Sequence, residues 1–205
     1  MRKQLTALVL ISLLLMGSFV GCGAQVQSRE PHIARMNLTT AQEEIVALLS
    51  PPGRENHIFE YRLDTTIEEA EFWVEIYHYG ELVETRKLLA MHGAPMPAVR
   101  GERLVLTIDS MENRIFRWTL QSGGAIAFGG EPWLASESSL AHGFGPMLMN
   151  VRIEDGQDIV LHTAILSNTN SLSTTIMEDP KTARQTPELL AEYTYVHFVL
   201  ARFSS

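Results

Sequence analysis

Apolar and polar residues alternate along most of the chain from residue 56 onward. The pattern is clear where Phe59, Tyr61 and Leu63 alternate with Glu60 and Arg62. A period of two places successive side chains on opposite faces of an extended strand, and it does not match the 3.6-residue period of a helix. A chain with this pattern must fold mainly as strands that each turn one face toward a core.

The alternation predicts about eight short strands joined by polar turns, with no helices between them. They are expected at 59–63, 72–76, 82–89, 104–108, 116–120, 147–153, 158–166 and 193–203. Turns are expected at 79–81 and 110–113, and the Asp-Gly pair within 154–157 predicts a hairpin between 147–153 and 158–166. We therefore expect a mainly β chain that forms a single antiparallel β-sandwich, immunoglobulin-like or similar.

One short helix is expected before the sandwich. Thr40 and Glu43 have the spacing of a capping box, and Ile45, Val46, Leu48 and Leu49 would form the apolar stripe. We expect this helix to pack over one end of the sandwich.

Two segments are expected to be irregular loops and to carry any binding surfaces. These are 121–146, which is rich in glycine, and 167–187, which is rich in Ser, Thr and Asn.

The first 22 residues have the organisation of an export signal. Arg2 and Lys3 precede an apolar stretch over 5–20, which is shorter than the roughly 20 residues of a membrane-spanning helix. It runs into Phe19-Val20-Gly21-Cys22, and Cys22 is the one cysteine of the chain. This segment resembles the lipobox of bacterial lipoprotein precursors, in which a small residue precedes an invariant cysteine. The resemblance implies that Cys22 becomes the mature N-terminus and carries a diacylglyceryl thioether.

The lipobox interpretation divides the chain into a signal peptide (1–21), a lipidated N-terminus and tether (22–38), and the helix with the sandwich (39–205). It implies a protein anchored by lipid at the extracytoplasmic face of the cell membrane. Two alternatives stay open, namely a secretory signal cut near Gly23-Ala24 and a short uncleaved anchor.

Charge and cysteine content exclude several classes of function. Loss of residues 1–21 removes two basic residues and no acidic ones, so the net charge falls from −8 to −10. An acidic surface argues against nucleic acid as a partner and against attraction to anionic lipid headgroups. A single cysteine excludes an internal disulfide and a Cys-based zinc site.

The chain lacks the local motifs of common enzymes. There is no Gly-x-Ser-x-Gly, Ser-x-x-Lys, His-Glu-x-x-His or phosphate-cradling loop in the sequence. We therefore expect no enzyme and no cofactor. The leading expectation is a non-enzymatic binding or interaction module with a protein or cell-wall partner, and an exported hydrolase ranks third.

Two residue groups support the second-ranked expectation, a lipoprotein that binds metal or carbohydrate. Met91, His92, Met96 and His142 offer the thioether and imidazole ligands that Cu(I) prefers, although methionine also fills ordinary cores. Trp73, Tyr77 and Tyr79 would share one face of a strand and could stack on sugar rings or on a partner. The competing interpretation is that both faces of this strand are buried. His162, in an apolar strand, is expected in the core.

Overall fold

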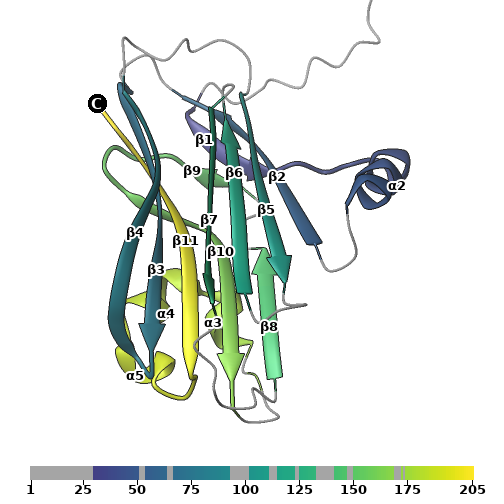
Figure 1. The fold of residues 1–205 in the computed structure, drawn as a ribbon. Coiled ribbons are helices and arrows are strands. Elements are labelled where there is room, and N and C mark those ends of the chain that lie inside the picture. Colours follow the sequence, from purple (N-terminus) through teal and green to yellow (C-terminus); the bar gives the residue numbers. More distant parts are fainter. Residues whose placement is uncertain are drawn as a thin grey trace, which may run out of the picture.

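The chain forms two antiparallel sheets that face each other (Figure 1). The structure is a computed structural model that describes residues 30–50, 54–63, 67–92, 102–110, 115–122, 125–132, 141–146, 150–168, 172 and 174–205. The strands are β1 (His32–Arg35), β2 (Arg54–Arg62), β3 (Glu69–His78), β4 (Glu81–His92), β5 (Glu102–Ser110), β6 (Ile115–Ser122), β7 (Ala125–Pro132), β8 (Ala141–Pro146), β9 (Val151–Arg152), β10 (Asp158–Ser167) and β11 (Tyr195–Ser204).

One sheet has the order β7-β6-β5-β2-β1-β9 and the other has the order β4-β3-β11-β10-β8. The expected mainly β antiparallel sandwich is therefore confirmed. The described ranges hold eleven strands rather than about eight.

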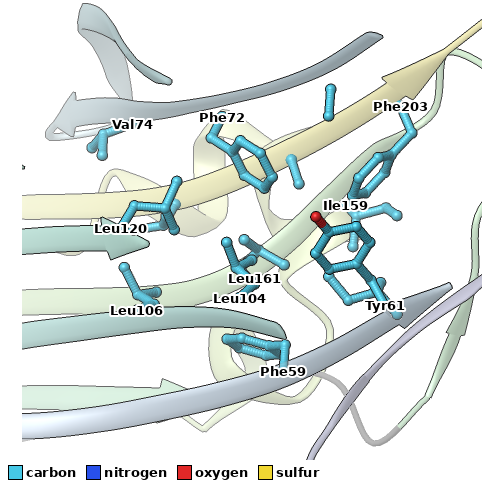
Figure 2. Close-up of a cluster of buried hydrophobic side chains, with 14 of the residues drawn as sticks. Phe59, Tyr61, Phe72, Val74, Leu104, Leu106, Leu120, Ile159, Leu161 and Phe203 are labelled. Atoms are coloured by element: carbon cyan, nitrogen blue, oxygen red, sulfur yellow. The ribbon is translucent and has the colours of Figure 1, made fainter. Parts of the chain in front are cut away.

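The main core lies between the two sheets and is formed by inward-facing residues of β1, β2, β3, β5, β6, β10 and β11 (Figure 2). Phe59 and Tyr61 of β2 share this core with Phe72 of β3 and Phe203 of β11, and all four are almost fully buried. The Phe203 ring lies edge-on to Phe72, with 6.0 Å between the ring centroids. Each large side chain buried in this way contributes on the order of 1.5–3 kcal/mol, so this layer holds the sheets together.

A second apolar cluster covers the outer face of the five-stranded sheet. The alternate residues of β3 and β11, such as Trp73 and Phe198, point away from the main core and pack against Ile176, Ala183 and Leu190. These last three residues belong to the short helices α3 (Thr175–Glu178), α4 (Pro180–Arg184) and α5 (Pro187–Leu190), which gather at one end of the sheet (Figure 1). The prediction of an irregular loop over 167–187 was therefore wrong for most of its length, because these turns are ordered by burial of their apolar residues.

The predicted hairpin between 147–153 and 158–166 does not form. The part of the first segment that is described, β9, pairs with β1, whereas β10 pairs with β11 and β8. Gly156 takes a positive φ of 68° in the turn, and its N–H donates to the Phe203 carbonyl at 2.8 Å. The Asp-Gly turn was thus correctly located, but it carries the chain from one sheet to the other instead of pairing its flanks.

The glycine-rich segment 121–146 contains two strands that were expected to be irregular. β7 pairs with β6, and β8 pairs with β10. Both are edge strands of their sheets, where glycine and proline are tolerated because only one side of the backbone must pair. The predicted turn at 110–113 falls mostly outside the described residues.

The region before β2 differs in three ways from expectation. Residues 32–35, assigned to the tether, form β1 and pair with β2 and β9. Helix α2 (Thr40–Leu49) is capped one residue earlier than expected, by a reciprocal capping box between Thr39 and Gln42. It also does not pack over the end of the sandwich, since most of its residues are exposed and it stands off one side (Figure 1).

In the described residues, no helix is long and apolar enough to cross a membrane.

Candidate functional site

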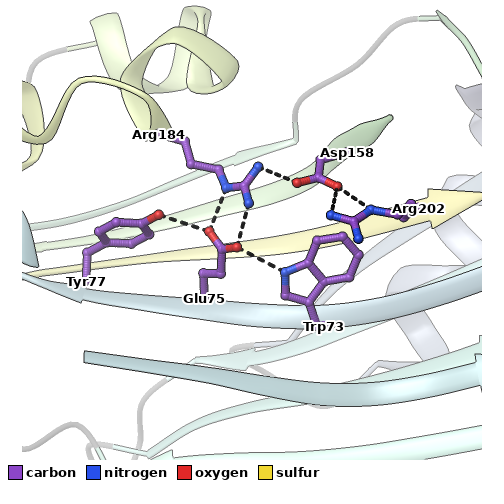
Figure 3. Close-up of polar contacts among 6 residues, drawn as sticks. All are labelled: Trp73, Glu75, Tyr77, Asp158, Arg184 and Arg202. Atoms are coloured by element: carbon purple, nitrogen blue, oxygen red, sulfur yellow. Dashed lines mark hydrogen bonds and ion pairs between the residues drawn. The ribbon is translucent and has the colours of Figure 1, made fainter. Parts of the chain in front are cut away.

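A network of charged and aromatic side chains lies on the outer face of β3 (Figure 3). Trp73, Glu75 and Tyr77 alternate along this strand and so project from the same face. Trp73 Nε1 donates a hydrogen bond to one carboxylate oxygen of Glu75 at 3.1 Å, and the Tyr77 hydroxyl donates to the other at 3.0 Å. Glu75 is buried, with a relative exposure of 6%.

Arg184 of α4 connects the helical segment to this strand. Its Nε and Nη2 atoms each donate to Glu75 at 2.6 Å, and Nη1 donates to Asp158 of β10 at 2.7 Å. Arg202 of β11 completes the network, because its Nε donates to Asp158 at 2.7 Å and its guanidinium lies 5.1 Å from the centre of the Trp73 ring. Two arginines and two carboxylates therefore tie α4, β3, β10 and β11 together (Figure 3).

The environment of Glu75 keeps this carboxylate ionised. Burial alone would raise its pKa, but the hydrogen bonds from Arg184, supported by those from Trp73 and Tyr77, outweigh burial and lower the pKa. Burial and the neighbouring Glu75 charge raise the pKa of Tyr77 to about 12. A carboxylate whose two oxygens already accept four hydrogen bonds is poorly suited to exchange protons with a substrate. The geometry of this network therefore indicates a structural role, in which it connects α4, β3, β10 and β11.

A hollow of about 380 Å³ adjoins the network, and Glu71, Trp73, Glu75, Thr85, Lys87 and Arg202 line it. Its size is in the range of small-molecule sites. Lys87 and Glu71 form an ion pair across it, which lowers the pKa of Glu71 and raises that of Lys87. Every charged side chain that lines the hollow is thus part of an ion pair, so a ligand would have to compete for these charges.

The three aromatic residues expected to form a binding platform are not exposed together. Trp73 and Tyr77 are each 8% exposed, because Arg202 and the segment that holds α3–α5 cover this face, whereas Tyr79 is 41% exposed in the turn after β3. The competing interpretation, that both faces of the strand are buried, is confirmed for Trp73 and Tyr77.

The candidate copper ligands fall in different surroundings. Met91 packs partly buried against the main core, and the Nδ1 atom of exposed His92 lies 3.0 Å from a Glu69 carboxylate oxygen. His142 lies in β8, but its side chain is not among those that the structure describes. Met96 and Cys22 lie outside the described residues. Over the described residues, histidine, cysteine and acidic side chains form no group of three or more that could hold a metal ion.

Sequence patterns singled out Trp73 and Tyr77 but missed the charged residues Glu75, Arg184 and Arg202 of the network. Glu75 lies between two aromatic residues on one strand face, and this spacing could have drawn attention to it. Arg184 is 109 positions from Glu75 along the chain, and nothing in the local sequence links the two.

Comparisons with protein-family models, with curated proteins and with solved structures found no match to this chain.

Proposed function

We propose that the protein is a lipid-anchored lipoprotein at the extracytoplasmic face of the cell membrane, where its β-sandwich serves as a non-enzymatic binding or interaction module. The single observation that carries this proposal is the position of the chain's one cysteine. Cys22 directly follows Gly21 at the end of a signal-like apolar stretch, where lipoprotein processing requires a cysteine. Two acyl chains on that residue would give stable attachment, whereas one would be marginal.

The chemistry of the described residues supports the non-enzymatic part of the proposal. The most buried carboxylate on the outer face, that of Glu75, is held ionised by Arg184, and each of its two oxygens already accepts two hydrogen bonds. The two cations that line the hollow are also in ion pairs, Lys87 with Glu71 and Arg202 with Asp158. Such groups hold structure and shape a surface, and they are not poised for acid–base or nucleophilic steps.

The charge of the chain supports a membrane contact made by lipid. The part after residue 21 carries a net charge of −10, which disfavours adsorption to anionic headgroups. The sandwich would then be held near the bilayer by the N-terminal lipid while its faces stay available to a protein or cell-wall partner.

The anchor is tested by expressing the full chain in a bacterial host and comparing the wild type with Cys22→Ser. Ser28→Ala, in the proposed tether, is the matched control. We expect the wild type and Ser28→Ala to enter the detergent phase in a phase-partition assay, and their N-terminal peptides to carry the diacylglyceryl mass. Cys22→Ser should lack this mass. An unmodified wild-type Cys22 would overturn the proposal.

A further inference from the structure

Helix α2 (Thr40–Leu49) presents an apolar face to solvent. Leu48 is 85% exposed and Ile45 is 56% exposed, and Ala41 is exposed on the same side. These three residues are spaced i, i+4 and i+7, the spacing of one helix face. The helix stands off the side of the six-stranded sheet (Figure 1), so the sandwich does not cover this face.

The helix is too short to owe its stability to its own hydrogen bonds. Isolated helices below about 12–15 residues are marginal in water, and α2 has ten residues. The capping box between Thr39 and Gln42 defines where it begins, and the Ser50 hydroxyl donates to the Val46 carbonyl at its end. An apolar face on such a helix indicates a surface that covers it when the protein is in place.

The position of α2 in the chain limits what that surface can be. Strand β1 is fixed between β2 and β9, and only four residues separate it from the start of α2. On the other side of β1, ten peptide units join Cys22 to His32, which gives a reach of at most about 35 Å. A lipid on Cys22 would therefore keep α2 close to the bilayer to which the protein is anchored.

We propose that α2 lies in the interface of that bilayer, with Ala41, Ile45 and Leu48 turned toward the acyl chains. This inference rests on the proposed lipid anchor. The helix carries Glu43 and Glu44 and has no Lys or Arg, so its contact is apolar rather than electrostatic, and the surface that fits it is a zwitterionic one. The anchor supplies the attachment, and the helix fixes how the sandwich is oriented on the membrane.

Site-directed fluorescence can test this contact in the lipidated full-length protein. Lipid would occupy the Cys22 thiol, so Ala41→Cys and, separately, Ala47→Cys each introduce one thiol for an environment-sensitive dye. Both positions are exposed alanines of α2, and at 3.6 residues per turn they lie about 120° apart around the helix. In phosphatidylcholine vesicles that contain spin-labelled lipid, we expect at least about threefold stronger quenching of the Ala41→Cys dye than of the Ala47→Cys dye, as the contrast between an acyl and an aqueous environment requires.

A further variant identifies the side chains responsible. Ile45→Ser with Leu48→Ser, made in the Ala41→Cys protein, should reduce the quenching to the Ala47→Cys level while the protein still floats with the vesicles. Equal quenching at the two positions in protein that floats would overturn the helix contact and leave the anchor intact. Protein that neither floats nor carries an acyl mass would overturn the anchor, and with it the contact.

Discussion

At the scale of single residues, two glycines with positive φ differ in what surrounds them. Gly80 has φ +83° in the β3–β4 turn, and a Cβ there would lie 2.5 Å from the Pro187 carbonyl oxygen at the start of α5. Gly156 has φ +68°, and a Cβ there would meet nothing within 4 Å. Both positions favour glycine for backbone reasons, but only Gly80 is also required by a close approach of two backbone segments.

Replacing each glycine by alanine should separate these two effects. Gly156→Ala is expected to cost about 1–2 kcal/mol of unfolding free energy, the cost of a side chain in the left-handed region. Gly80→Ala should cost about 3–4 kcal/mol, because the clash with the α5 backbone adds an overpacking cost to the same φ effect. Urea unfolding of both variants measures the difference. Equal losses would show that the turn and α5 are not in contact.

The turn around Gly80 also shows what local sequence can and cannot predict. Tyr79-Gly80 was correctly expected to reverse the chain, because glycine before a new alternating segment is a local signal. The contact of Gly80 with Pro187 spans more than a hundred positions, and no local signal encodes it. The same limit explains why Trp73 and Tyr77 suggested an exposed platform, although Arg202 and the α3–α5 segment cover them.

At the scale of elements, α4 is fastened to β3 by a buried ion pair. Arg184 binds both oxygens of Glu75, and the two side chains are 22% and 8% exposed. Arg86 offers a matched surface pair, because it contacts Glu84 at 2.6 Å with both side chains more than a third exposed. The fold thus contains the same Arg–Glu interaction in a buried and an exposed setting.

Arg184→Met should destabilise the protein by about 2–4 kcal/mol, since it leaves the Glu75 charge buried without its partner. Arg86→Met should cost less than about 1 kcal/mol, as exposed pairs do. Denaturant unfolding measures both values. The pKa of Glu75 is lowered in the fold, so its contribution is present above the carboxyl's ordinary pKa near 4.5 and is lost as the pH falls below it.

The pH dependence gives this prediction an independent check. The difference in unfolding free energy between wild type and Arg184→Met should shrink as the pH is lowered below about 4.5, because a protonated Glu75 no longer needs the guanidinium. A difference that stays constant down to pH 3 would contradict a role through the Glu75 charge.

Most of the strands with alternating residues were predictable from this sequence, whereas several of the strand partners were not. The alternation along β2, β3 and β11 follows from burial of one face, which any neighbour can provide. The partner of each strand depends on which backbone edge is free. Strand β9 therefore pairs with β1, although the turn that follows β9 had suggested a hairpin with β10. The glycine-rich β7 and β8 were missed because an edge strand can be held by backbone pairing with little help from its side chains.

At the scale of the whole molecule, closing the two sheets brings histidines into one interior. His57 of β2 lies opposite His162 of β10, with ring centroids 4.8 Å apart, and His197 of β11 projects from the same face as the core residues Val199 and Ala201. All three histidines are at most 3% exposed. His162 was expected in the core, and its burial is confirmed.

Burial keeps His162 and His197 neutral. Burial lowers the pKa of His197 to about 3. Burial, with the nearby His57 and His197, lowers the pKa of His162 well below its ordinary value. The Tyr195 ring lies next to these histidines, with its centroid 6.4 Å from that of His197. On its other side it stacks on the ring of His78 of β3, with 4.6 Å between the centroids. The unfolded chain therefore binds more protons than the fold at mildly acidic pH.

This difference predicts that the sandwich loses stability as the pH falls. The folded pKa values are depressed, so the histidine contribution is full above the unfolded value of about 6.5 and is lost progressively below it. Each of His162 and His197 should cost about 2 kcal/mol at pH 5 relative to pH 7. Chemical unfolding at pH 7, 6 and 5 should show a total loss of about 4 kcal/mol in the wild type. His162→Gln should lose only about half as much, because one histidine no longer has to be kept neutral. A His162→Gln slope equal to that of the wild type would show that His162 does not carry the acid sensitivity.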